Sequence, residues 1–134
     1  MLKHPNRLLF AALAVGWAVL IYYLSSQPGI DTPTLFPGQD KLLHLIAFGM
    51  LGFLVMGAMK RTASGYRPGQ VWFTVTLVTL YGLLDESHQY FVPHRTVEFY
   101  DLLADAAGGL LGAWSMYYLV RALSNRSRPI PPAA

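Results

Sequence analysis

The stretch LLFAALAVGWAVLIYYL, residues 8–24, is seventeen residues long and carries no charge. One helical crossing of a bilayer takes about 17–25 residues, so this run is long enough to be a membrane span. It exceeds the apolar region of about 7–15 residues that signal peptides use, and no A-x-A cleavage pattern follows it. Further apolar runs occupy residues 42–59, 71–84 and 102–120.

The third of these runs reaches the length of a span only if its helix continues to residue 91, shortly before Pro93. Proline removes a backbone donor and ends a helix, so we expect the helix to stop there. We therefore predict four spans, at about residues 8–24, 42–59, 71–91 and 99–120. The basic, proline-ended segment 124–134 is predicted to be a flexible tail.

The composition agrees with a membrane protein. The chain has 134 residues, of which 54% are hydrophobic and 13% charged, whereas a soluble domain carries about 25% charged residues. An aromatic content of 13% and a net charge of +3 exclude a disordered chain. The absence of cysteine excludes disulfides, zinc–thiolate sites and cysteine nucleophiles. The sequence thus predicts one all-α domain, a bundle of four transmembrane helices.

Basic residues predict the direction of this bundle. The side that holds both termini would carry eight of the ten, namely Lys3, Arg7, Lys60, Arg61, Arg67, Arg121, Arg126 and Arg128. The opposite side would carry only Lys41 and Arg95. The positive-inside rule then places both termini in the cytoplasm. The same rule explains the basic net charge, so nucleic acid is not an expected partner.

Acidic residues gather at the other, extracytoplasmic end. Six of the seven, all but Asp31, fall in three short segments that lie at span boundaries. With their polar neighbours, these segments contain Asp40, Lys41 and His44, then Asp85, Glu86, His88 and Gln89, and finally Arg95, Glu98, Asp101 and Asp105. Three distant stretches of sequence therefore deliver polar groups to one layer.

Helical spacing orients the acidic stripe of the fourth span. Asp101 and Asp105 are four residues apart and share a helix face, which continues as Gly108 and Gly112. Charge within hydrocarbon is costly, so this face is predicted to turn toward the second and third spans. The small residues predict close helix packing, and Gly49 and Gly52 offer a matching surface on the second span.

The motifs of this chain resemble those of the VanZ-like family of small bacterial membrane proteins. They are Tyr23-Leu24-Ser25-Ser26-Gln27-Pro28, Asp40-Lys41-Leu42-Leu43-His44, Tyr81-Gly82, Glu86-x-x-Gln89, Val92-Pro93-His94-Arg95, and Asp101 followed by Asp105, Gly108 and Gly112. The resemblance covers about residues 22–112. The chain departs from the family at His94, where the family often has glycine, and at Asp105, where it often has asparagine.

The resemblance implies a multi-pass protein of the bacterial cytoplasmic membrane. The family's namesake is associated with low-level resistance to teicoplanin, a lipid-tailed glycopeptide, although many members occur outside resistance clusters. The polar segments at the extracytoplasmic end lead us to expect a membrane lipid or a lipid-linked envelope precursor as the partner. Four spans of about 20 residues bury little interior per protomer, which makes a homodimer a candidate assembly.

Three functions remain open from the sequence. The first is recognition of a polar head group, in which Lys41 and Arg95 hold a phosphate or carboxylate and neighbouring side chains bind hydroxyl groups. The ligand-binding candidates are Asp40, Lys41, His44, Glu86, Gln89, Arg95, Glu98, Asp101 and Asp105.

The second function is a metal-dependent enzyme acting on a phosphorylated or glycosylated lipid. A divalent metal would use Asp40, His44, Glu86, Asp101 and Asp105 as its candidate ligands. Glu86, Asp101 and His44 are then the candidates for catalysis. The third function is that of a structural partner in an envelope complex, with the polar cluster acting as an ion-paired staple between helix ends.

Overall fold

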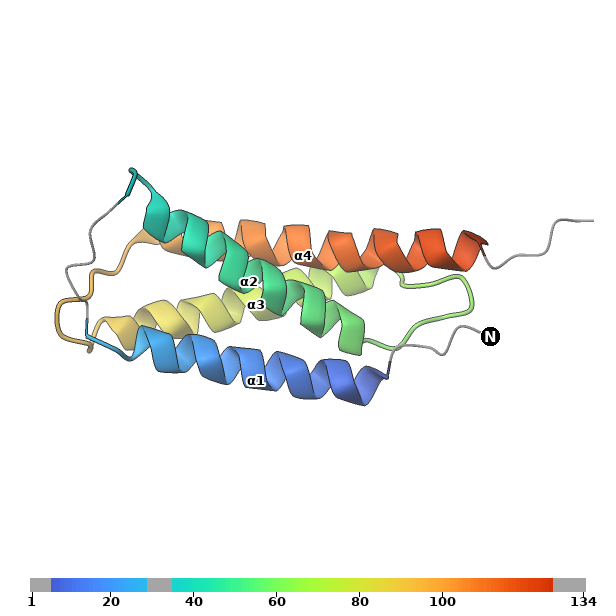
Figure 1. Cartoon of the computed structure of the whole chain (residues 1–134), viewed down its shortest axis with the longest axis horizontal. Coiled ribbons are helices and arrows are strands. Elements are labelled where there is room, and N and C mark those ends of the chain that lie inside the picture. The colour runs from blue at the N-terminus through green and yellow to red at the C-terminus, as the bar shows by residue number, and fades with distance from the viewer. Residues whose placement is uncertain (1–5, 29–34, 127–134) are drawn as a thin grey trace, which may run out of the picture.

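The computed structural model describes residues 6–28 and 35–126, which form four helices. They are α1 (Arg7–Ser25), α2 (Gln39–Ala58), α3 (Pro68–Gln89) and α4 (Phe99–Arg126). Consecutive helices run in opposite directions along the long axis, so α2 and α4 are parallel (Figure 1). The prediction of an all-α chain with four helices is confirmed, and no strand forms within the described residues.

Local sequence explains where two of the helices begin. The Asn6 side chain accepts a hydrogen bond from the Leu8 N–H at 3.1 Å, which caps α1. At the start of α3, Pro68 occupies a position where a missing N–H costs nothing. The Gln70 side chain there accepts a hydrogen bond from the Arg67 N–H at 2.8 Å.

Two predicted boundaries differ from the structure. The third helix ends at Gln89 rather than at residue 91. The backbone hydrogen bonds that follow join residues three apart instead of four, for example Val92 N–H to the Gln89 carbonyl at 3.0 Å. The fourth helix continues to Arg126, so residues 124–126 are helical and not part of a tail. No glycine or proline stands between residue 112 and Pro129 to end it sooner. Residues 127–134 lie outside the described part of the chain.

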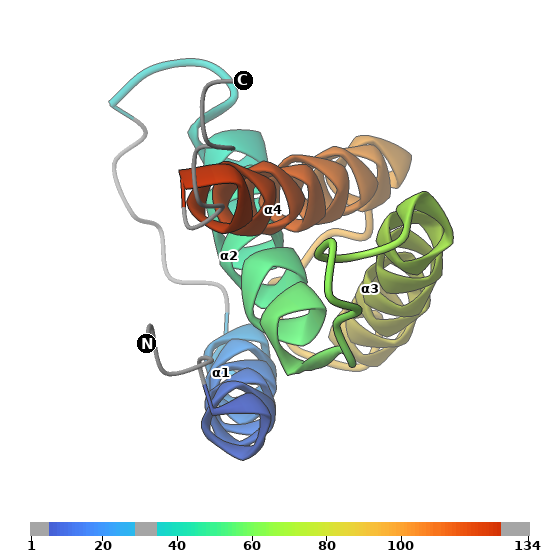
Figure 2. The ribbon, with the colours of Figure 1, turned by 90° about the vertical axis from the view of Figure 1, so that its right-hand side faces the viewer.

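Glycines hold α2 against α4, as the sequence predicted. A Cβ atom added at Gly52 would lie 2.5 Å from the Gly109 carbonyl oxygen, and one at Gly49 would lie 3.4 Å from the Gly108 oxygen. A Cβ at Gly112 would clash with the backbone of α2. Absence of side chains thus lets the two backbones approach closely. The end view shows α1 at the edge of this assembly, beside α2 (Figure 2).

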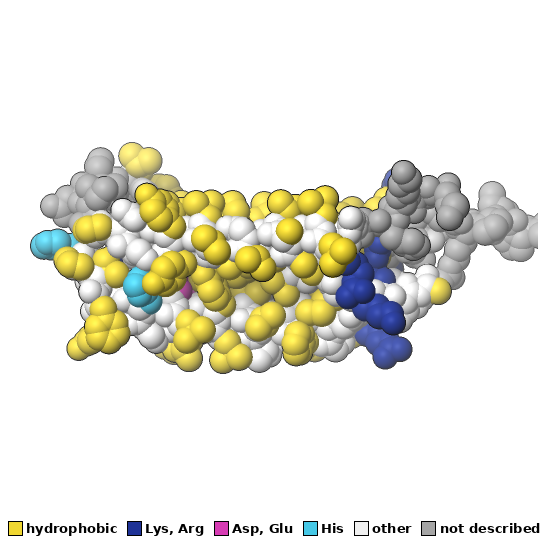
Figure 3. Space-filling model, turned by 90° about the horizontal axis from the view of Figure 1, so that it is seen from below, with side chains coloured by type: hydrophobic (Ala, Val, Ile, Leu, Met, Phe, Trp, Pro, Cys, Tyr) yellow, Lys and Arg dark blue, Asp and Glu magenta, His cyan; other side chains and the backbone are white. Residues whose placement is uncertain are grey.

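The outer surface of the bundle is apolar. Large hydrophobic side chains cover the face seen in Figure 3, between basic side chains at one end and histidines at the other. Leu8, Val15, Val19, Phe73 and Leu111 are each more than half exposed. Soluble monomers rarely expose so continuous an apolar surface. Of the described helices, α1 and α2 are long and apolar enough to cross a membrane.

Candidate functional site

The three predicted polar segments meet at one end of the bundle, which we call the acidic end. It is formed by the last turns of α1 and α3, the first turns of α2 and α4, and the connection between α3 and α4 (Figure 1). The antiparallel order of consecutive helices produces this arrangement, because each acidic segment lies at the same end of its helix in space.

Lys41 forms ion pairs with three carboxylates at the acidic end. Its Nζ lies 2.7 Å from Asp40 Oδ2, 2.7 Å from Glu98 Oε2 and 3.3 Å from Asp101 Oδ1. The contact with Asp101 is an ion pair outside hydrogen-bonding geometry. These contacts tie the start of α2 to the start of α4, and the Lys41 charge is fully offset by its neighbours.

His44 and Asp105 form a second pair one turn deeper. His44 Nδ1 lies 2.8 Å from Asp105 Oδ1, and the Asp105 side chain is completely buried. Gly82 on α3 makes room for this carboxylate, since a Cβ there would lie 2.6 Å from Asp105 Oδ2. The prediction that the α4 stripe faces α2 and α3 is therefore confirmed.

Glu86 is the residue whose environment is least satisfied. It is 4% exposed, and neither of its carboxylate oxygens has a hydrogen-bond partner. The backbone N–H of Glu98 lies near it, outside hydrogen-bonding geometry. One ligand atom from each of His44, Glu86 and Asp101 lies within 4.8 Å of the other two. These three residues, from α2, α3 and α4, are arranged as a set that could hold a metal ion.

A separate network joins α1 to α3. Ser25 Oγ donates to Asp85 Oδ2 at 2.7 Å, and Gln89 Nε2 donates to the same oxygen at 3.0 Å. Ser26 Oγ lies 2.9 Å from His88 Nε2. Gln89 thus binds Asp85 and does not pair with Glu86. Sequence reasoning did not select Ser25 and Ser26 as site residues, although both stand in one of the motifs that carry the family resemblance.

Arg95 belongs to neither group of carboxylates. Its Nη2 donates to the Leu24 carbonyl at 3.0 Å and its Nε donates to the Gln27 carbonyl at 3.1 Å, so it caps the end of α1. The preceding His94 has a φ of 60°, in the left-handed region that favours glycine. That conformation explains why glycine suits this position in the VanZ-like pattern.

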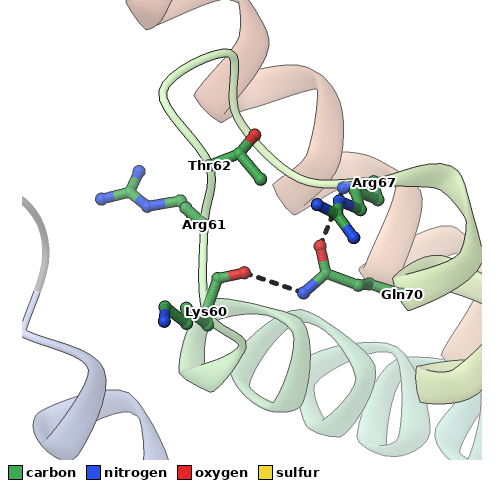
Figure 4. Close-up of a pocket in the computed structure, with 5 residues that line it drawn as sticks. All are labelled: Lys60, Arg61, Thr62, Arg67 and Gln70. Atoms are coloured by element: carbon green, nitrogen blue, oxygen red, sulfur yellow. Dashed lines mark hydrogen bonds between the residues drawn. The ribbon is translucent and has the colours of Figure 1, made fainter.

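The opposite end, which we call the basic end, carries a different chemistry. It contains Arg7, Lys60, Arg61, Arg67, Arg121 and Arg126. A cavity of about 400 Å³ there is lined by Lys60, Arg61, Thr62, Arg67 and Gln70 (Figure 4). The Gln70 side chain spans it by donating to the Lys60 carbonyl at 2.9 Å. This cavity lies at the far end of the bundle from Glu86 and His44.

Comparison with known protein families gives a match over most of the chain. The family model VanZ/LLP1 matches residues 10–121, a range that includes every predicted site residue. No curated protein and no solved structure matches the chain. The match covers most of the chain, and α1 and α2 have the length and composition to cross a bilayer. The chain therefore belongs to the VanZ/LLP1 family and is a membrane protein of that family.

Proposed function

We propose that this protein crosses the bacterial cytoplasmic membrane four times, with both termini inside, and recognises the head group of a lipid or glycolipid at its acidic end. The charge distribution supports this orientation, because the described basic end holds six cationic side chains and the positive-inside rule assigns it to the cytoplasm. The acidic end then faces the outer leaflet, at the depth where lipid head groups lie.

The observation that carries this proposal is the buried, unpartnered carboxylate of Glu86. Leaving a buried acceptor without a partner costs about 1–3 kcal/mol, and more when the group is charged. Folded proteins retain such groups chiefly where they serve a function. A ligand that brings hydroxyl groups or positive charge to Glu86 would supply the missing partner.

A link to glycopeptide resistance follows from the same site. Teicoplanin is a lipid-tailed glycopeptide, and a lipid-linked envelope precursor would present its head group at the same membrane surface. A protein that binds the head group of such a precursor would change how the antibiotic partitions at the membrane surface. This part of the proposal rests on the family resemblance and on the position of the acidic end at the outer leaflet.

A specific observation also favours the second candidate function, a metal-dependent enzyme acting on a phosphorylated or glycosylated lipid. The Asp105 carboxylate holds His44 through Nδ1, as a carboxylate orients a histidine that carries protons, and a ring nitrogen of His44 lies within 4.8 Å of carboxylate oxygens of Glu86 and Asp101. Turnover of a bound lipid would distinguish an enzyme from a binding protein.

Native mass spectrometry of the full chain, purified in detergent, tests the proposal. We expect a co-purified lipid adduct on the parent protein and at least a tenfold smaller adduct fraction on Glu86→Gln, a loss of about 1.4 kcal/mol of binding free energy. Thr74→Val is the matched control, since Thr74 is fully buried in the same helix but lies away from the acidic end. Equal adducts on all three proteins, or none on any, would contradict recognition at Glu86 and favour the ion-paired staple around Lys41.

A further inference from the structure

We infer that His44, Glu86 and Asp101 bind one divalent transition cation, Mn²⁺ or Zn²⁺, and that Asp105 is the positioning residue for the imidazole. The inference rests on the proposed function, because the cation gives the site its affinity for a phosphate group on the lipid. Within the described residues, these side chains converge from three helices at the acidic end, with one donor atom of each within 4.8 Å of the others.

The donor set suits a transition metal. One imidazole nitrogen and two carboxylate oxygens match the ligands that Mn²⁺ and Zn²⁺ accept, whereas Mg²⁺ and Ca²⁺ prefer oxygen alone. Three protein ligands leave coordination positions for a ligand or water, as in metal sites that bind substrates. Glu86 and Asp101 are 4% and 6% exposed as whole residues, so the ion would be shielded from bulk solvent on the protein side.

The His44–Asp105 pair provides an independent argument. His44 Nδ1 is hydrogen-bonded to Asp105 Oδ1 at 2.8 Å. The other ring nitrogen, Nε2, is therefore the one available to an ion. Metal-binding histidines are commonly held in this way by a carboxylate on the other ring nitrogen. Gly82 maintains the arrangement, because a side chain at that position would push the Asp105 carboxylate away.

A second group of carboxylates lies beside the first, but Lys41 already compensates its charge, so we do not propose it as a metal site. Oxygen atoms of Asp40, Glu98 and Asp101 also lie within 4.8 Å of one another. The Lys41 ammonium is 2.7 Å from two of these residues and 3.3 Å from the third, so it already supplies the positive charge. Glu86 has no such neighbour, which makes its group the one that an ion would complete.

The charge of the acidic end explains what the cation does. Among the described residues this end carries six carboxylates against two permanent cations. Lys41 is surrounded by carboxylates, and Arg95 is bound to the carbonyls of Leu24 and Gln27. A phosphate would be repelled by such a surface. A divalent cation would neutralise the charges of Glu86 and Asp101 and offer the phosphate oxygens a direct ligand, so the chemical class of the bound head group is a phosphate ester or diphosphate.

Titration calorimetry on the chelator-treated full chain in detergent tests the metal site directly. We expect the parent to bind one Mn²⁺ or Zn²⁺ per chain. Glu86→Gln should bind the metal at least about 100-fold more weakly, because loss of a group that only supports a metal ligand already weakens binding by about 10–100-fold. Thr74→Val should bind like the parent. Glu98→Gln should bind within about fivefold of the parent, because exposed ion pairs contribute about 1 kcal/mol or less.

Thermal unfolding of the metal-free proteins separates a ligand site from a structural one. Glu86→Gln removes a buried unpaired charge, so we expect it to unfold at a higher temperature than the parent while it loses metal binding. A lower unfolding temperature together with unchanged metal affinity would overturn the inference. So would the absence of Mn²⁺ and Zn²⁺ binding in the parent, or a loss of binding in Glu98→Gln alone.

Phosphatidylglycerol and inorganic phosphate, added separately with and without Mn²⁺, then distinguish the metal site from the lipid function. Binding of the lipid that requires Mn²⁺ and exceeds that of phosphate supports both proposals. Metal binding without lipid binding supports the metal site and contradicts head-group recognition. Lipid binding that is equal with and without Mn²⁺ contradicts the role of the cation and leaves head-group recognition standing.

Discussion

Buried carboxylates at the acidic end differ in how they are compensated. Asp105 is fully buried and pairs with His44, Asp85 accepts two hydrogen bonds, and Glu86 accepts none. A buried charge is tolerated when a partner or a bound ion offsets it. Of these three residues, Glu86 alone has no hydrogen-bond partner for either carboxylate oxygen, and the proposed site rests on this contrast.

Replacing Asp105 by asparagine tests how the imidazole is positioned. The amide oxygen of asparagine can still accept a hydrogen bond from the Nδ1–H of His44. It carries no negative charge, however, so it would not raise the basicity of Nε2 as a metal ligand. We therefore expect Asp105→Asn to weaken Mn²⁺ binding by about 10–100-fold without abolishing it. Titration calorimetry measures the affinity, and circular dichroism checks that the helices remain. An affinity equal to that of the parent would show that Asp105 does not orient His44.

Some of this site could be predicted from the sequence because it depends on spacing within one helix. The four-residue interval between Asp101 and Asp105 was enough to turn both toward α2 and α3. The partners of Arg95 could not be predicted in the same way. They depend on how the α3–α4 connection passes the end of α1, a tertiary relation that no local pattern contains. The pairing of Ser25 with Asp85 depends in the same way on the rotation of α1 against α3.

At the scale of elements, the bundle is asymmetric. The α2–α4 pair is joined by glycines that bring backbone against backbone, whereas α1 is attached to its neighbours through polar side-chain bonds. One is the hydrogen bond from Trp17 Nε1 to the Ala47 carbonyl at 2.8 Å, and another joins the Tyr81 hydroxyl to the Ala18 carbonyl at 2.6 Å. Because His44 and Asp101 lie on α2 and α4, the tightest helix contact is also the one that sets the distance between two of the proposed ligands.

Replacing Gly112 by alanine tests this contact. The new Cβ would meet the backbone of Gly49 and Phe53, which cannot move without separating the two helices. We expect Gly112→Ala to destabilise the protein by about 1–3 kcal/mol and to weaken metal binding. Gly16→Ala is the control, since nothing lies within 4 Å of that position and alanine there should stabilise α1 by about 0.5–1 kcal/mol. Thermal unfolding in detergent compares the two. Equal stability of both variants would contradict the close packing of α2 and α4.

At the scale of the whole molecule, charge and apolar surface are arranged along one axis. Most cationic side chains lie at one end and the described carboxylates lie at the other. Exposed hydrophobic side chains lie between the two ends (Figure 3). α3 and α4 carry acidic residues in their end turns, so their sequences are less uniformly apolar than those of α1 and α2. The number of crossings therefore depends on whether the α3–α4 connection lies on the same side of the membrane as the α2–α3 connection.

Labelling of single introduced cysteines can determine the number of crossings, because the parent chain has no cysteine and therefore gives no background labelling. Ser64 and Thr96 are exposed residues in the α2–α3 and α3–α4 connections, respectively. If all four helices cross, a membrane-impermeant maleimide should label Thr96→Cys in intact cells and label Ser64→Cys only after the membrane is permeabilised. Protection of both cysteines in intact cells would mean that only α1 and α2 cross. The reverse pattern would place the acidic end in the cytoplasm, where neither an outer-leaflet lipid nor a glycopeptide could reach Glu86.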